Sequence, residues 1–315
     1  MRTMTTLDSH IFRPTRGFMG VPAGTGLEGA RAAILGMPFD CGADPYRIGA
    51  RQGPGAIRDQ AIRLDGPYPT ISMRDPLADL AVVDCGDANV ISGRVEEAHE
   101  VMQAAVNRIA EAGAIPVTMG GDGAVTLPQL RALGPRHDGL VVVHFDSHTD
   151  AYPIEGQRRY TNATTFNCAA EEGLIDTEES WHIGIRGTCR HPDILDFTRA
   201  FGYRLVTADT LFERGIDTVI AEMVAAIGAR PVYLCWDMDV FDPSCAPGVC
   251  DPTWGGLTAR EGIAALRALA GLNIVACDVN TVSPPHDSAG MTALLAANVM
   301  LICLHLLNMN RLSGS

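Results

Sequence analysis

Two apolar segments of this chain each end in acidic side chains that lie two residues apart. The segments are VVHFDSHTD, beginning at residue 142, and LCWDMDVFDPSCAPG, beginning at residue 234. Their alternating polar side chains are Asp146, His148, Asp150, Asp237 and Asp239. Side chains at positions i and i+2 of an extended strand point to the same face. If the two strands are neighbours, four carboxylates and one imidazole converge on one spot.

Carboxylates packed this closely repel one another and cannot all stay ionised unless a cation lies among them. Oxygen-rich sites with one or two imidazoles suit Mn²⁺, and Ni²⁺ or Zn²⁺ are alternatives. A pair of such ions lowers the pKa of a bridging water, so that hydroxide is available near neutral pH. The alternative, in which the aspartates only cap turns, explains one aspartate better than it explains both motifs. The sequence therefore predicts a protein that binds divalent metal ions.

Eight short apolar runs alternate with helical patterns along the chain. Several of these runs are continuous, which is typical of strands covered on both faces in a parallel sheet. The expected strands are residues 31–37, 80–84, 114–119, 139–145, 181–185, 203–207, 232–236 and 273–277. This order predicts one α/β domain over residues 31–315, a three-layer α-β-α arrangement with a parallel eight-stranded sheet. Residues 1–30 are expected to form an N-terminal arm.

Helices are expected in the segments between these strands, namely near residues 94–112, 124–133, 191–201, 216–228, 258–270 and 288–308. In such folds the ligand crevice lies beyond the carboxyl ends of the strands. The two acidic motifs follow strands directly, and so do Asp122 and Asp278. These positions favour one shared site at that edge of the sheet.

Composition excludes several classes of partner. The net charge of −13 argues against binding to nucleic acid or to an anionic membrane surface. Nine cysteines without a CxxC pair predict small buried hydrophobes rather than a disulfide framework, and thus a cytoplasmic protein. Residues 288–310 carry no formal charge and are long enough to span a bilayer. Because Asn298, His305 and Asn308 interrupt this segment, a buried terminal helix is expected and no membrane span.

The motifs make the chain similar to the arginase/agmatinase (ureohydrolase) family, and most similar to its agmatinase branch. The resemblance covers nearly the whole chain. Its segments are FDCGADPYRIGARQGPGAIR at 39–58, MGGDGAVT at 119–126, HFDSHTD at 144–150, WDMDVFDPSCAPG at 236–248 and DVNTVSPPHD at 278–287. The resemblance implies an arginase-like fold, trimers or hexamers, and release of urea from a small guanidino substrate by a hydroxide that two metal ions hold.

The resemblance also assigns the metal ligands. The second metal would be held by Asp146, His148, Asp237 and Asp239, all of which are present. The first metal would keep Asp146, Asp150 and Asp237 but would lack its histidine. The family pattern reads GGDH, and here Gly123 stands at the histidine position. We therefore expect one complete site and one that lacks a ligand, occupied by Mn or Ni.

Two further positions depart from the family. Asn162 stands where agmatinases have a histidine that relays protons, and it cannot exchange a proton near neutral pH. Thr281 stands where the family has a glutamate that pairs with the substrate guanidinium. Asp150 and Asn162 are candidate catalytic positions, while Thr281 and His286 are candidate substrate-binding positions.

Two functions remain open at this point. In the first, the chain is an impaired subunit that assembles with an active homologous ureohydrolase subunit, as in assemblies resembling metformin (dimethylbiguanide) hydrolases. In the second, it is a self-sufficient, agmatinase-like amidinohydrolase with an altered guanidino substrate. The three departures favour the first function, because all of them fall at the reaction centre. The whole acidic cluster keeps the second open.

Overall fold

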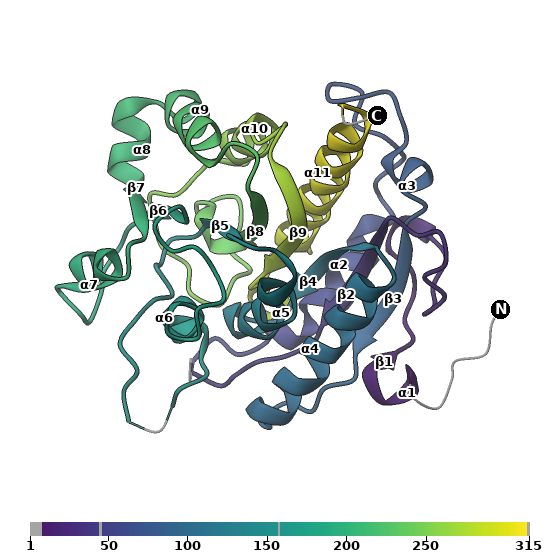
Figure 1. The fold of residues 1–315 in the computed structure, drawn as a ribbon, viewed down its shortest axis with the longest axis horizontal. Helices are drawn as coiled ribbons and strands as arrows, with labels where there is room; N and C mark the ends of the chain where they lie inside the picture. Colours follow the sequence, from purple (N-terminus) through teal and green to yellow (C-terminus); the bar gives the residue numbers. More distant parts are fainter. Residues whose placement is uncertain (1–7, 44–45, 157, 314–315) are drawn as a thin grey trace.

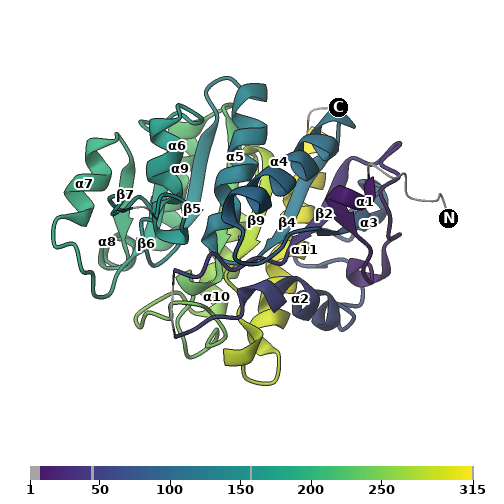
Figure 2. The same cartoon turned by 90° about the horizontal axis from the view of Figure 1, so that it is seen from below.

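The structure, a computed structural model, describes residues 8–43, 46–156 and 158–313. A central sheet lies between two layers of helices, as Figures 1 and 2 show. The strands are β1 (Phe12–Arg13), β2 (Ala32–Met37), β3 (Val83–Ala88), β4 (Ile115–Gly120), β5 (Val141–Phe145), β6 (Trp181–Ile185), β7 (Arg204–Thr207), β8 (Pro231–Asp237) and β9 (Asn273–Asn280). Their order across the sheet is β1-β3-β2-β4-β9-β8-β5-β6-β7. The predicted three-layer fold is confirmed.

The eight expected strands are β2 to β9, and all of them pair in parallel. The expectation of a sheet with eight strands, all parallel, is wrong at one edge. There β1 adds a ninth strand, antiparallel to β3. It comprises two residues, Phe12 and Arg13. A strand this short has no alternation or apolar run that sequence reading can detect.

Each face of the sheet is covered by its own helices, and each interface has its own hydrophobic cluster. One layer comprises α1 (Asp8–Ile11), α4 (Val95–Glu111), α5 (Thr126–Leu133) and α6 (Thr165–Glu171). The other comprises α2 (Gly53–Ala61), α9 (Ile216–Ile227), α10 (Ala259–Ala268) and α11 (Met291–Ser313). Figure 2 shows α4 and α5 on one side of the sheet and α2 and α10 on the other. Shorter helices lie toward the sheet edges, namely α3 (Pro76–Asp79), α7 (Ile194–Ala200) and α8 (Ala208–Arg214).

Helix α4 shows how the sequence produces this layer. Its buried residues recur at helical spacing and include Ala98, Met102, Val106 and Ile109. The chain leaves the helix at Gly113, whose positive φ of 77° is a conformation that glycine adopts without a Cβ clash. The expected helix near residues 94–112 is therefore confirmed.

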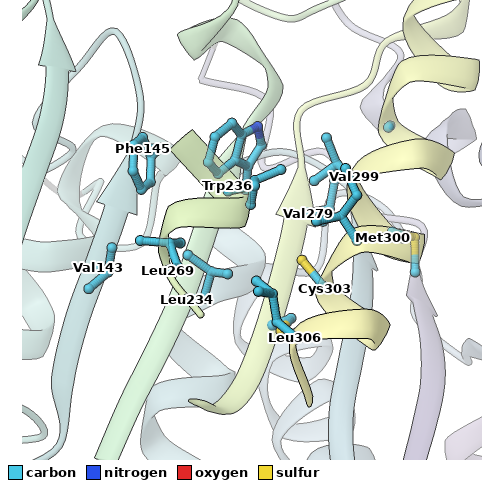
Figure 3. Close-up of a cluster of buried hydrophobic side chains, with 14 of the residues drawn as sticks. Val143, Phe145, Leu234, Trp236, Leu269, Val279, Val299, Met300, Cys303 and Leu306 are labelled. Atoms are coloured by element: carbon cyan, nitrogen blue, oxygen red, sulfur yellow. The ribbon is translucent and has the colours of Figure 1, made fainter. Parts of the chain in front are cut away.

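Helix α11 is long and apolar enough to cross a membrane by length and composition alone. However, 78% of its most apolar window is buried inside the protein. Its Met300, Cys303 and Leu306 face the sheet residues Leu234 and Val279 (Figure 3). This is the expected buried terminal helix, and its apolar surface covers one face of the sheet.

A buried ion cluster joins α2 to β3. Nη2 of Arg58 lies 2.8 Å from Oδ1 of Asp84, and its Nη1 lies 2.6 Å from Oδ1 of Asp87. The side chain of Arg58 is 2% exposed and that of Asp84 is fully buried. Buried charges of this kind are tolerated only when they are paired and hydrogen-bonded. Arg58 therefore supports the scaffold and does not face the acidic motifs.

Replacing Arg58 with alanine should lower the free energy of unfolding by about 3–5 kcal/mol, because it leaves the buried Asp84 carboxylate without its ionic partner. Urea unfolding followed by circular dichroism measures this. Arg63→Ala is the matched control, since Arg63 is exposed and its guanidinium donates to the side chain of Gln60, three residues away; its effect should stay within about 0.5 kcal/mol. Equal stability of the two variants would contradict the assigned role of the cluster.

Candidate metal centre

The two acidic motifs meet at the carboxyl ends of neighbouring strands. Strands β5 and β8 pair in parallel, with Phe145 opposite Trp236. Asp146 follows β5 directly, so it lies beside Asp237, the last residue of β8. Asp239 lies two residues further along the chain, in the 3₁₀ helix η6 (Met238–Val240). The prediction that these two strands are neighbours is therefore confirmed.

Asp146 lies at the centre of two compact groups of possible ligand atoms. One group joins Asp146 to His148 and Asp239, and the other joins it to His144 and Asp150. Within each group the ligand atoms lie within 4.8 Å of one another. An ion with ligands at about 2.1 Å needs ligand atoms roughly 3–4 Å apart. Small side-chain adjustments would thus let each group hold one ion, with Asp146 shared.

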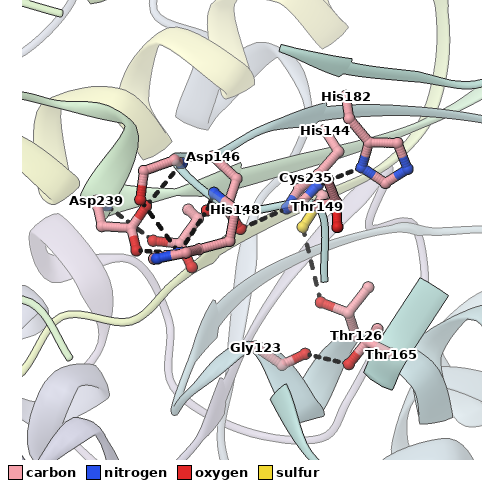
Figure 4. Close-up of polar contacts among 12 residues, drawn as sticks. Gly123, Thr126, His144, Asp146, His148, Thr149, Thr165, His182, Cys235 and Asp239 are labelled. Atoms are coloured by element: carbon pink, nitrogen blue, oxygen red, sulfur yellow. Dashed lines mark hydrogen bonds and ion pairs between the residues drawn. The ribbon is translucent and has the colours of Figure 1, made fainter. Parts of the chain in front are cut away.

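The first group is close to that spacing already. Nδ1 of His148 lies 3.3 Å from Oδ1 of Asp146 and 3.1 Å from Oδ2 of Asp239 (Figure 4). The other ring nitrogen of His148, Nε2, lies 3.3 Å from Oδ2 of Asp251. A carboxylate on the outer nitrogen of a metal-binding histidine fixes the ring's tautomer and orientation. Asp251 is in position to do this for His148.

The electrostatics of the cluster call for a cation. Burial raises the pKa of Asp150, Asp237 and Asp239, and neighbouring carboxylates raise it further. Burial also opposes ionisation of Asp146, but the imidazoles of His144 and His148 lower its pKa below the usual range. Without added positive charge, the carboxylates cannot all be ionised at neutral pH.

One buried carboxylate oxygen also fits a bound ion. Oδ2 of Asp146 lies 2.8 Å from Nε2 of His144 but has no well-formed hydrogen bond from the part of the chain that the structure describes. Buried carboxylate oxygens are nearly always hydrogen-bonded or bound to metal. The oxygen-rich donor set with imidazoles suits a divalent ion such as Mn²⁺ or Ni²⁺. The residues present therefore fit the predicted metal.

Gly123 and Asn162 border this cluster. A Cβ atom on Gly123 would lie 2.9 Å from Oδ2 of Asp150 and 3.5 Å from Cβ of Asn162. A side chain at position 123 would therefore crowd the Asp150 carboxylate, which would have to shift to make room for a histidine there. Asn162 begins the 3₁₀ helix η5 (Asn162–Thr164), and its Oδ1 lies 3.6 Å from Sγ of Cys41. A small pocket here is lined by Asp40, Gly42, Arg47, Ile48, Asp122, Asn162 and Cys250.

Thr281 bonds a predicted metal ligand. Its hydroxyl donates to Oδ1 of Asp237, and its backbone N–H donates to the carbonyl of Gly121 at 2.7 Å. Its φ of 66° is an outlier for a β-branched residue, and Asp150 also has a positive φ of 46°. Strained backbone of this kind persists where the surrounding structure enforces it, often at functional sites. The structure thus places Thr281 against Asp237.

Asp237, the two other acids near strand ends and His286 lie outside the two ligand groups. Asp237 borders these groups, because its Oδ1 accepts from the backbone N–H of Asp239 at 2.7 Å. Asp278 lies within β9 and accepts from the hydroxyl of Thr126 at 2.6 Å. Asp122 accepts from the backbone N–H of Cys41 at 2.6 Å. His286 lies in the 3₁₀ helix η7 (Pro284–His286), and its buried Nε2 has no hydrogen-bond partner among the described residues.

Sequence reasoning missed two residues of the centre, His144 and Asp251. His144 stands two residues before Asp146, so the same alternation that marked His148 and Asp150 could have found it. Asp251 lies in the loop that follows the second acidic motif. No spacing rule connects it to His148, because loop conformation alone brings the two together.

The sequence model of the arginase family matches residues 30–305, which carry every ligand described above. The chain belongs to the arginase family. A guanidinopropionase from Pseudomonas aeruginosa is 38% identical over 290 residues, covering 91% of this chain and 90% of the relative. An agmatinase from Enterobacter sp. is 38% identical over 274 residues, covering 87% and 86%. These relatives fit the predicted agmatinase branch.

The fold of this arginase-family chain is also found in a solved structure. The proclavaminate amidino hydrolase of Streptomyces clavuligerus superimposes with a TM-score of 0.89 at 35% sequence identity. The match covers 95% of this chain and 99% of that one. The predicted arginase-like fold is therefore confirmed over almost the whole length.

Replacing Asp146 with asparagine should abolish stabilisation by Mn²⁺, because the Asp146 carboxylate belongs to both ligand groups. Wild type should gain about 3 kcal/mol when Mn²⁺ is present at roughly 100 times its Kd. Thermal melts after EDTA dialysis, with and without added Mn²⁺, measure the difference. Asp138→Asn is the control, since Asp138 is exposed in a turn. A Mn²⁺ shift in Asp146→Asn as large as in wild type would rule out this centre.

Proposed function

We propose that this chain is a metal-binding subunit of an amidinohydrolase that releases urea from a guanidino or biguanide compound, and that its own site is impaired. It acts in a homologous assembly, a trimer or hexamer, in which another arginase-family subunit carries the active site. One observation supports this proposal most directly, namely which residues of the metal centre are kept and which are changed. Its acidic ligands converge, while the positions that would act on the substrate are changed.

Asn162 and Thr281 support the impairment. Asn162 lies where a proton would be relayed, and a carboxamide neither gains nor loses a proton at neutral pH. The hydroxyl of Thr281 is already bonded to Asp237. Thr281 also carries no charge, so a buried substrate guanidinium would have no ionic partner at this position. Binding and proton transfer are both weakened, while the scaffold is whole.

The retained acids support a bound divalent ion, proposed to be Mn²⁺ or Ni²⁺. Asp146, Asp150, Asp237 and Asp239 are all buried, and three of them have raised pKa values because of burial and mutual repulsion. A divalent ion at such a site supplies Lewis-acid activation of water. All nine cysteines are free, which supports the proposed reducing, cytoplasmic setting.

A second candidate function is favoured by the same acids. A subunit without any reaction would gain little from keeping four buried carboxylates together, since their repulsion destabilises the fold without an ion. The chain could then hydrolyse a bulkier or less basic guanidino compound that needs no ionic partner at Thr281. The two functions differ in whether the isolated chain turns over substrate.

Reconstitution separates the two functions. The chain is purified alone, and again after co-expression with an active arginase-family subunit. Urea release is then measured with agmatine, guanidinobutyrate and metformin. The proposal expects the isolated chain to bind metal and release no urea, and the co-purified assembly to release it. A partner whose metal-binding aspartates are replaced should silence the assembly. Urea release by the isolated chain would instead establish the second function.

Restoring the family residues should restore substrate binding. The triple variant Gly123→His, Asn162→His, Thr281→Glu regains an imidazole at two positions and a carboxylate at the third. The restored ion pair should tighten guanidinium binding by about 100-fold or more. Calorimetric titration with agmatine measures this. The control is the triple variant Gly123→His, Asn162→His, Thr281→Gln, because glutamine has the size of glutamate but carries no charge. Equal affinity of the triple variant and wild type would show that these positions do not face the substrate.

A further inference from the structure

His144 is a buried histidine that the family's ligand pattern does not use. It lies in β5, two residues before Asp146, so both side chains lie on the same face of the strand. Its side chain is 2% exposed. Its Nε2 lies 2.8 Å from Oδ2 of Asp146. Imidazole, a preferred ligand of divalent transition metals, is therefore held in contact with the central carboxylate of the site.

Nε2 of His144 closely approaches Oδ2 of Asp146, at 2.8 Å, and this oxygen has no well-formed hydrogen bond from the described residues. An imidazole nitrogen and a carboxylate oxygen this far apart have the spacing of two ligands on one ion. Atoms of His144, Asp146 and Asp150 also lie within 4.8 Å of one another.

We propose that His144 ligates the first metal ion, in place of the imidazole that Gly123 lacks. The inference rests on the proposed function in one respect, namely that the acidic cluster binds divalent ions. The resulting set of one imidazole with the carboxylates of Asp146 and Asp150 matches the ligand types of the family pattern. The imidazole comes from strand β5 instead of the segment after β4.

The surroundings of His144 suit a metal-bound ring. Its Nδ1 lies 2.8 Å from Nδ1 of His182 in the neighbouring strand β6 (Figure 4). One of these two nitrogens must donate and the other accept. A ligand histidine nearly always donates its outer N–H to a fixed acceptor, which orients the ring. His182 provides that acceptor, and the ring of Phe166 lies 4.5 Å from the His144 ring, centroid to centroid.

Manganese binding to the whole chain tests the proposal. The protein is stripped with EDTA, saturated with Mn²⁺ and desalted, and bound Mn is counted per chain by elemental analysis. Electron paramagnetic resonance then reports whether two Mn²⁺ ions are magnetically coupled. Wild type should hold two coupled ions, and His144→Phe, which keeps an aromatic ring beside Phe166, should hold one uncoupled ion. His99→Phe is the control, because His99 is equally buried but lies outside the centre.

A rescue variant guards against simple misfolding. Gly123→His restores the family imidazole, so His144→Phe combined with Gly123→His should again bind two coupled ions. Failure of this rescue, or two coupled ions in His144→Phe alone, would overturn the ligand role of His144. One ion in both wild type and His144→Phe would overturn it as well, while leaving the group of Asp146, His148 and Asp239 and the proposed function standing. No bound Mn²⁺ in wild type would overturn the proposed metal-dependent function itself.

Discussion

Repulsion among buried carboxylates is the constraint on which the rest of this structure depends. Four aspartates meet where two parallel strands end, and burial removes the water that would otherwise solvate their charges. The imidazoles of His144 and His148 lower the pKa of Asp146, but the pKa values of Asp150, Asp237 and Asp239 stay raised. A divalent ion is the simplest way to complete the balance, and the ligand atoms already lie near the spacing that such an ion requires.

The architecture explains why this cluster can exist. A strand places alternate side chains on one face, and a parallel sheet brings the carboxyl ends of its strands to one edge. The buried core on both faces, with α11 packed across one of them, fixes the positions of β5 and β8. The scaffold is thus rigid where the ligands are attached. The catalytic departures fall in the segments beyond the strands, where substitution does not disturb the core.

Much of this could be predicted from the sequence, for reasons that particular elements make plain. Strands such as β2 and β5 are buried along their whole length, so each appears as a continuous apolar run. Helix α2 was not predicted because its sequence, GPGAIRDQA, opens with glycines and proline and shows no strong apolar stripe. The edge strand β1 was too short to detect.

In the candidate site, too, the positions set by strands could be predicted and those set by loops could not. Four of the five predicted ligands, Asp146, His148, Asp150 and Asp239, fall in the two ligand groups, and Asp237 lies beside Asp239. Alternation and strand pairing place them there, and both can be read from sequence. The contact of Asp251 with His148 and that of Thr281 with Asp237 depend on loop conformation, and for Thr281 on a left-handed backbone. Neither contact follows from a periodic pattern in the sequence. His144 shares the alternation of Asp146 and His148, but it lies before the end of its apolar run, so the motif at the strand end does not include it.

Thr281 carries a consequence of its own. With its amide on Gly121 and its hydroxyl on Asp237, this one residue cross-braces the ends of three strands, β4, β8 and β9. A carboxylate at this position could pair with a cationic substrate, whereas the hydroxyl of Thr281 bonds Asp237. Thr281 therefore holds the carboxyl ends of these strands at fixed positions relative to one another.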